Sequence, residues 1–240
     1  MIWFFIRLTL YYLFFVALIP TFFGRTFHYN VIWAKKDKTP WVTITFDDGP
    51  DPVYTPELLS LLEKYDIKAC FFLLADKAQK YPALVQEIVK RGHEIGIHGY
   101  RHYMNWLLGP RATYMELKKS VEIIKNITGK SIHYYRPPWG LFTGFIYRYV
   151  RKLELKIVLW SFMSWDWKYK KPYKIAKYVL KKVRGGNILI FHDSGTNIGA
   201  DKNAPEAMIQ SLEYIIKGIR QKNLEIVDIN SFVYSEKKSA

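Results

Sequence analysis

From residue 41 onward, short apolar runs alternate with longer amphipathic segments, and this alternation constrains the fold more than any other feature. The runs typical of strands are 41–46, 69–74, 94–97, 132–136, 156–160, 187–191 and 225–229. Helical periodicity fills the intervals near 55–65, 80–91, 112–127, 143–153, 172–183 and 204–221. Strands that alternate with helices favour a parallel sheet, either open or closed into a barrel. A chain of 240 residues can hold one such domain with a sizeable core.

The N-terminal stretch is apolar over residues 2–23, apart from Arg7, two threonines and the tyrosines. At about 1.5 Å per helical residue it can span a hydrocarbon core of about 30 Å. No Ala-x-Ala pattern precedes Arg25, which favours an uncleaved anchor over a cleaved secretory signal, with a buried amphipathic helix as a third alternative. We therefore expect an anchor or signal segment at 1–24, a basic linker at 25–40 and one domain at 41–240.

The net charge of +15 indicates a basic surface, because residues 1–40 contribute only +4 and leave +11 for the rest. Such a surface suits nucleic acid, anionic lipid or an acidic wall polymer, unless it is simply solvated lysine. Nucleic acid is not expected because no recognisable binding motif is present, and nothing indicates a protein partner. The single cysteine, Cys70, excludes an intramolecular disulfide and is expected in a buried strand.

Two polar clusters follow the first and third strand-like runs of the body. Asp47 and Asp48 end the first run, and adjacent like charges are costly unless a metal ion or an arginine compensates them. His98 and His102 follow the run at 94–97. Two histidines and one carboxylate are a common site for a catalytic divalent ion. Asp48 with the two histidines would complete such a site and leave Asp47 free as a base.

Three more clusters follow later runs. They are Arg136-Pro137-Pro138-Trp139-Gly140, Ser164-Trp165-Asp166-Trp167 and His192-Asp193-Ser194-Gly195. Arg136 can pair with Asp47 and hold it ionised, and tryptophans beside an acid suggest a sugar platform. Each cluster alone has an ordinary structural explanation. Five of them at strand ends are typical of an α/β active site, where the catalytic residues come from the carboxyl ends of several strands.

These residues resemble the motifs of the polysaccharide deacetylase family, also called carbohydrate esterase family 4 or the NodB-homology domain. The resemblance covers about residues 40–230, in the family's order. The matching segments are Thr45–Pro50, His98-x-x-x-His102, Arg136–Gly140, Asp166-Trp167 and Ile190–Asp193. It implies an α/β fold, a distorted (β/α) barrel with about seven strands, here preceded by the N-terminal hydrophobic helix. One departure from the family pattern is Gly99, where Ser or Thr usually follows the first histidine.

The resemblance also implies a mechanism. Asp48, His98 and His102 would bind a divalent metal, usually zinc, with cobalt, nickel or manganese as alternatives. Asp47, oriented by Arg136, would act as general base, and His192, oriented by Asp166, as general acid. The backbone N–H of Trp139 would stabilise the oxyanion, Trp167 and Ile190 would hold the acetyl methyl group, and Pro137 is a further expected substrate contact.

The function implied is removal of N-acetyl groups from an acetylated polysaccharide, with peptidoglycan or another wall glycan favoured by the basic surface and the apolar segment. An esterase for O-acetyl groups of xylan type and a catalytically silent carbohydrate-binding module are the alternatives. We expect membrane anchorage with the domain outside the cytoplasm, or secretion after cleavage. The excess of Lys and Arg just after the apolar segment points the other way by the positive-inside rule.

Overall fold

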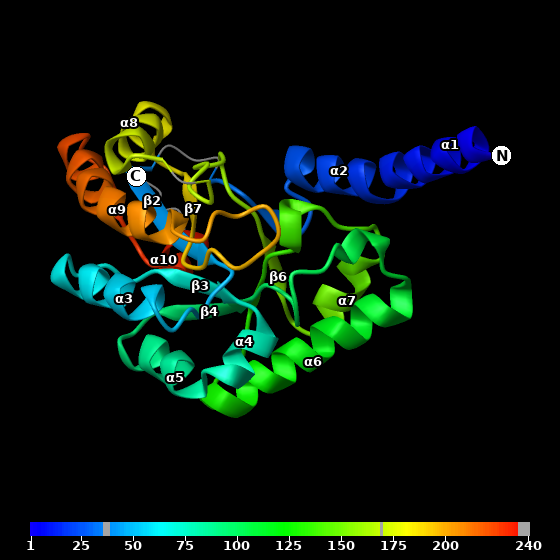
Figure 1. Cartoon of the computed structure of the whole chain (residues 1–240), viewed down its shortest axis with the longest axis horizontal. Helices are drawn as coiled ribbons and strands as arrows, with labels where there is room; N and C mark the ends of the chain where they lie inside the picture. Colours follow the sequence, from blue (N-terminus) through cyan, green and yellow to red (C-terminus); the bar gives the residue numbers. More distant parts are fainter. Residues whose placement is uncertain (36–38, 169, 235–240) are drawn as a thin grey trace.

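The computed structural model describes residues 1–35, 39–168 and 170–234. A curled parallel sheet forms its centre (Figure 1). Its strands are β1 (Val31–Ile32), β2 (Trp41–Asp47), β3 (Cys70–Leu73), β4 (Glu94–Ile97), β5 (Tyr134–Tyr135), β6 (Lys156–Val158), β7 (Ile188–His192) and β8 (Glu225–Ile226). The order across the sheet is β1-β6-β5-β4-β3-β2-β7, and β8 pairs with the start of β2. The expected α/β fold with about seven strands in an incomplete barrel is confirmed.

All seven predicted strands form, and β1 is an additional one. It lies within the stretch expected to be a linker and pairs with β6 through Val31 and Ile157. The strand signal failed there because two residues are too few for a periodic pattern. The boundary at residue 41 stays a prediction, but the sheet itself begins before it.

Helices cover the outside of the sheet (Figure 1). Their bounds are α3 (Tyr54–Lys64), α4 (Ala75–Lys80), α5 (Pro82–Lys90), α6 (Pro110–Thr128), α7 (Ile146–Lys152), α8 (Pro172–Lys182), α9 (Ala204–Gln221) and α10 (Ile229–Tyr234). The six predicted helices all form, whereas the short α4 and α10 were not predicted. Both ends of α6 are marked in the sequence: the helix begins at Pro110, and Gly129 ends it in the left-handed conformation.

The core lies between the sheet and these helices. Strand β2 is buried on both faces, with Ile44 and Phe46 completely inaccessible. The Phe46 ring packs between those of Phe71 on β3 and Phe191 on β7, at centroid distances of 5.2 and 6.0 Å. Cys70 is buried as expected. Burial on both faces is the usual state of parallel strands, and it makes the carboxyl edge of the sheet a rigid platform.

The N-terminal helix is continuous but not uniform. Helix α1 (Ile2–Tyr12) passes through a π-helical segment, Leu13–Leu18, into α2 (Ile19–Phe27). Its residues Ile6–Phe27 are long and apolar enough to cross a membrane, a property that a signal sequence shares. The helix extends beyond the body of the domain (Figure 1).

Helix α2 is docked on the domain. Thr21 exchanges two hydrogen bonds with the backbone of Phe142, and Tyr147 donates to the Pro20 carbonyl at 3.1 Å. Gly24 allows this approach, because a Cβ there would lie 2.8 Å from the Val31 side chain. The apolar helix is therefore attached to the domain by specific polar contacts as well as by the chain.

The turn after β2 requires a glycine at position 49. A Cβ added at Gly49 would lie 2.8 Å from Cγ of the buried Asp193. We expect Gly49→Ala to lower the free energy of unfolding by about 1–3 kcal/mol, because neither the carboxyl group nor the backbone can move freely there. Gly109→Ala is the matched control, since a Cβ at Gly109 meets nothing within 4 Å. Equal unfolding free energies for the two variants in a denaturant titration would contradict the close approach.

Candidate active site

The five polar clusters meet at the carboxyl edge of the sheet. Asp47 at the end of β2 is in register with His192 at the end of β7, and Arg136 directly follows β5. Three non-glycine residues in these turns have left-handed backbones: Asp48 (φ 79°), Trp139 (φ 64°) and Trp165 (φ 62°). Such conformations cost energy and persist where the surrounding structure enforces them, which occurs most often at functional sites.

Asp47 is paired with Arg136, as predicted. Arg136 Nη1 donates to Asp47 Oδ1 at 2.6 Å and to Thr45 Oγ1 at 2.7 Å, and both partners of the ion pair are almost completely buried. Burial raises the pKa of the Asp47 carboxyl, and the charge of Arg136 opposes that rise. The other oxygen, Oδ2, lies 3.9 Å from His98 Nε2, and Asp47 lines the pocket. Asp47 therefore has one oxygen fixed and one available for proton transfer.

Asp48, His98 and His102, the three residues expected to bind a metal, lie together as a triad. Asp48 Oδ1 lies 3.5 Å from His98 Nε2 and 3.6 Å from His102 Nε2, and one ligand atom from each residue fits within 4.8 Å of the others. Asp48 Oδ1 is buried without a hydrogen-bond partner among the described residues, a costly state that a cation would relieve. The donor set therefore fits a divalent ion.

His98 is prepared for ligation by its other nitrogen. Nδ1 lies 2.7 Å from the Arg136 carbonyl, so Nδ1 carries the proton and Nε2 presents its lone pair to the triad. Burial lowers the pKa of His98 to about 3, against the opposing charge of Asp48, which keeps the ring neutral. A neutral imidazole with a fixed tautomer is the form that binds metals.

Two residues that the sequence analysis missed hold the triad's backbone. Lys77 on α4 donates from Nζ to the Asp48 carbonyl at 2.7 Å, which supports the left-handed turn there. Glu116 on α6 accepts from the Tyr100 amide at 2.5 Å, between the two histidines. Gly99 (φ 104°) has no room for a side chain, because a Cβ would lie 2.7 Å from Glu116 Oε1. The left-handed backbone and the nearby carboxyl group of Glu116 both favour glycine at this position.

His192 and Asp166 form the predicted second pair. Asp166 Oδ1 lies 3.0 Å from His192 Nδ1, and Oδ2 accepts from the His192 backbone N–H at 2.7 Å. Ser164 also donates to Asp166 Oδ1. Burial lowers the pKa of His192, but the charge and hydrogen bond of Asp166, aided by Asp48 and Asp47, outweigh it and raise the pKa to about 9. His192 is therefore protonated at neutral pH, as a general acid must be.

A pocket lies over these groups, with aromatic walls. Trp139 packs edge-on against His102, with 5.1 Å between the ring centroids, and Trp167 packs in the same way against His192, at 5.5 Å. Ile190 also lines the pocket, whereas Pro137 is buried in its loop and is not among the lining residues. Sequence analysis missed the lining residues Trp160, Met163, Asn197, Ile198, Gly199 and Ala200. Nothing in their local sequence marks them, since only the folding of the chain brings them to the pocket.

Comparison with known proteins agrees with this geometry. The sequence model of the family described as polysaccharide deacetylase matches residues 34–158, more than half of the chain. The chain belongs to the polysaccharide deacetylase family. It is accordingly a hydrolase of carbohydrate esterase family 4, and the Asp48-His98-His102 triad is typical of that family's metal site.

Several relatives of this deacetylase are known. A peptidoglycan-N-acetylglucosamine deacetylase of Bacillus cereus is 29% identical over 208 residues, which cover 85% of this chain and 92% of the relative. A chitooligosaccharide deacetylase of Sinorhizobium fredii is 32% identical over 64% of this chain and 72% of its own length. The crystal structure of the Bc1960 peptidoglycan N-acetylglucosamine deacetylase has a TM-score of 0.81 at 27% identity and covers 90% of this chain and 98% of its own.

We expect the deacetylase to lose its metal when a histidine of the triad is removed. His102→Ala should lower zinc affinity by more than about 100-fold, because even the loss of a residue that only orients a ligand costs 10- to 100-fold. Zinc affinity would be measured by titration calorimetry against a chelator. The control is His133→Ala, which removes an exposed histidine remote in sequence from the triad. Equal zinc affinity in the two variants would contradict the assignment of His102.

We also expect Asp166→Asn to change the pH dependence of the deacetylase. The substitution removes the negative charge that holds a proton on His192, so the pKa of His192 falls. Activity that needs protonated His192 is lost as pH rises through that pKa, and the alkaline limb of kcat/KM should therefore move toward neutral pH. A limb that stays in place while the overall rate falls would contradict the coupling.

Proposed function

We propose that this enzyme removes N-acetyl groups from amino sugars of a wall polysaccharide, with peptidoglycan as the substrate class. The observation that carries the proposal is that the adjacent carboxylates Asp47 and Asp48 have different partners and therefore suit different roles. Asp47 is held by Arg136 through one oxygen and lines the pocket, whereas Asp48 completes an Asp-His-His cluster in which only His102 is partly exposed. Across the pocket, His192 holds a proton through Asp166.

These positions support the following proposed proton transfers. A divalent ion at the triad would supply Lewis-acid chemistry, which lowers the pKa of water and polarises a carbonyl. Asp47 accepts the proton of the attacking water, and Arg136 keeps the carboxylate in place. His192 then donates its proton to the leaving nitrogen, and Asp166 stabilises the charged ring until that step. The products are acetate and a free amino sugar.

The remaining expected site residues are assigned to binding. Trp167 and Ile190 line the pocket beside His192 and form the apolar slot for the acetyl methyl group. The backbone N–H of Trp139 stabilises the oxyanion. The positive φ of Trp139 orients this peptide group for that role. Pro137, expected as a substrate contact, does not line the pocket, and we assign it instead to stiffening this loop.

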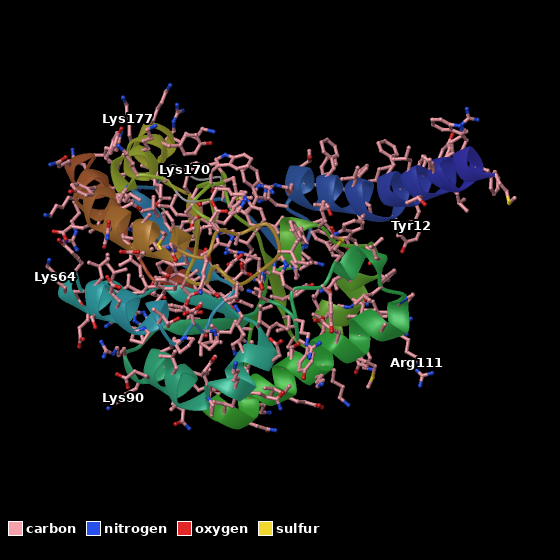
Figure 2. The ribbon with its side chains drawn as sticks, in the orientation of Figure 1. Tyr12, Lys64, Lys90, Arg111, Lys170 and Lys177 are labelled. Carbon is pink, nitrogen blue, oxygen red and sulfur yellow. The ribbon has the colours of Figure 1, made fainter. Side chains whose placement is uncertain are left out.

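A basic segment that follows the pocket-lining Trp167 in the chain favours an anionic glycan. Between Trp167 and Arg184 the chain carries seven lysines and no Asp or Glu, and most of this segment forms α8. Lys170 and Lys177 mark this side of the molecule in Figure 2. Among the described residues only Lys168 of this group has a carboxylate within 4 Å, that of Asp201. Uncompensated positive charge attracts wall polymers that carry carboxylates, such as peptidoglycan.

The N-terminal helix fits the same proposal. We infer that it holds the enzyme at the membrane with the domain outside the cytoplasm, where the wall substrate lies. Large domains cross membranes largely regardless of the charge that follows the apolar segment. The organisation proposed is thus an apolar anchor at 1–24, a connecting segment at 25–40 that includes β1, and the catalytic domain at 41–240.

The test is acetate release by the full-length, zinc-loaded protein in detergent from peptidoglycan, chitin oligomers and acetyl-xylan. We expect release from N-acetylated substrates and most from peptidoglycan. Asp47→Asn should lower the rate by about 10²- to 10⁴-fold, the usual contribution of a general base, without loss of zinc. Asp66→Asn is the matched control, because Asp66 is exposed and its left-handed backbone tolerates Asn.

Other outcomes would replace the proposal. Release from acetyl-xylan alone would identify an O-acetyl esterase. Glycan binding without acetate release would identify a silent binding module, and a pseudoenzyme of carbohydrate esterase family 4 from Bacillus anthracis has this fold at 22% identity and a TM-score of 0.76. Full activity of Asp47→Asn would refute the role of Asp47.

A further inference from the structure

Two arginines hold the carbonyl groups of three consecutive residues, the last of which lines the pocket. Arg136 donates from Nε to the Val158 carbonyl at 3.0 Å and from Nη2 to the Leu159 carbonyl at 3.1 Å. Arg25 donates from Nη2 to the next carbonyl, that of Trp160, at 2.6 Å. The two guanidinium groups come from segments more than 100 residues apart. Together they fix the backbone where β6 ends and the pocket begins.

The side chain of Trp160 lies between the same two arginines. Its ring centroid is 5.8 Å from Cζ of Arg136 and 5.9 Å from Cζ of Arg25. The ring lines the pocket and packs on Gly140, where a Cβ would lie 2.6 Å from the indole. Trp160 therefore connects Arg25 with both the pocket wall and the loop that carries Trp139.

Arg25 is held by Trp33 as well as by Trp160. Trp33 Nε1 donates to the Arg25 carbonyl at 2.6 Å, and the Arg25 guanidinium lies 5.6 Å from the Trp33 ring centroid. Ser161 donates to the Trp33 carbonyl at 2.7 Å, which closes a ring of contacts back to the wall. No carboxylate of a described residue lies within ion-pairing distance of Arg25. The charge is stabilised by a carbonyl dipole and two indole faces, an arrangement that suits guanidinium and not ammonium.

We propose that Arg25 is a positioning residue of the active site, which sets the place of Trp160 in the pocket wall from the membrane-proximal end of the chain. The inference rests on the proposed function for its kinetic consequences. It extends the site beyond the region that matches the family, which begins at residue 34. The segment that leaves the anchor thus contributes to the reaction and does not merely tether the domain.

The test compares Arg25→Ala and Arg25→Lys with Arg111→Ala in the full-length, zinc-loaded protein. Arg111 is an exposed arginine of α6 that points into solvent (Figure 2). We expect Arg25→Ala to lower kcat/KM by about 10- to 100-fold, because small misplacements of a site wall have effects of that size. Its preference for N-acetyl over N-propionyl sugar should also fall, since a displaced Trp160 leaves more room. Arg25→Lys should lie between Arg25→Ala and wild type, and Arg111→Ala should match wild type.

A second measurement separates this inference from the proposed function. Hydrogen exchange of the segment around Trp160 should accelerate about tenfold in Arg25→Ala, because the Leu159 and Ser161 amides then lose a fixed neighbour. A wild type that releases no acetate would refute the proposed function, and the exchange result alone would then decide the inference. If the wild type is active, an unchanged acyl preference in Arg25→Ala overturns the inference. Unchanged hydrogen exchange in Arg25→Ala overturns it whether or not the wild type is active. If Arg25→Ala fails to fold, Trp33→Phe should shift exchange in the same direction, because it removes the N–H that holds the Arg25 carbonyl and reduces the aromatic face beside the guanidinium.

Discussion

The buried guanidinium of Arg136 is the interaction on which the rest of the site depends. It contacts β2 through Thr45 and Asp47, the end of β6 through two carbonyls, and β3 through the ring of Phe72, which lies 4.0 Å from Cζ. A fully buried cation is costly unless its donors are satisfied, and here they are satisfied by groups that belong to different strands. The carbonyl of the same residue fixes the tautomer of His98. One side chain and its own peptide group therefore order both halves of the site.

The two adjacent carboxylates show how the backbone separates chemical roles. Asp47 is the last residue of a regular strand and points toward Arg136, whereas Asp48 has a left-handed backbone that turns its side chain toward the histidines. Two like charges next to each other are tolerated where each has its own compensating group: Arg136 compensates Asp47, and a cation held with the two histidines would compensate Asp48. Lys77, which binds the Asp48 carbonyl, stabilises the turn that makes this separation possible.

Much of the fold and the centre of the site could be predicted from the sequence. Runs such as 41–46 and 187–191 predict strands clearly. The polar residues that follow them occur in a combination and an order that is compatible with few functions. The missed features depend on contacts between distant segments. Arg25, Glu116 and Trp160 act through neighbours that are remote in sequence, and an isolated arginine or tryptophan carries no local mark of such a partner. Strand β1 was missed because its two residues are ordered by pairing with β6 and not by a pattern of their own.

The docking of the N-terminal helix limits how the protein can meet a lipid bilayer. Tyr12 donates to the Trp106 carbonyl at 3.3 Å and projects toward the body of the domain (Figure 2). While that contact and those of Thr21 and Arg25 hold, the part of the helix that precedes Tyr12, residues 1–11, has a length of about 16 Å. This is about half of a hydrocarbon core of about 30 Å. A docked helix can thus enter a single leaflet, with the catalytic pocket held near the headgroups, and a full crossing requires the helix to leave the domain.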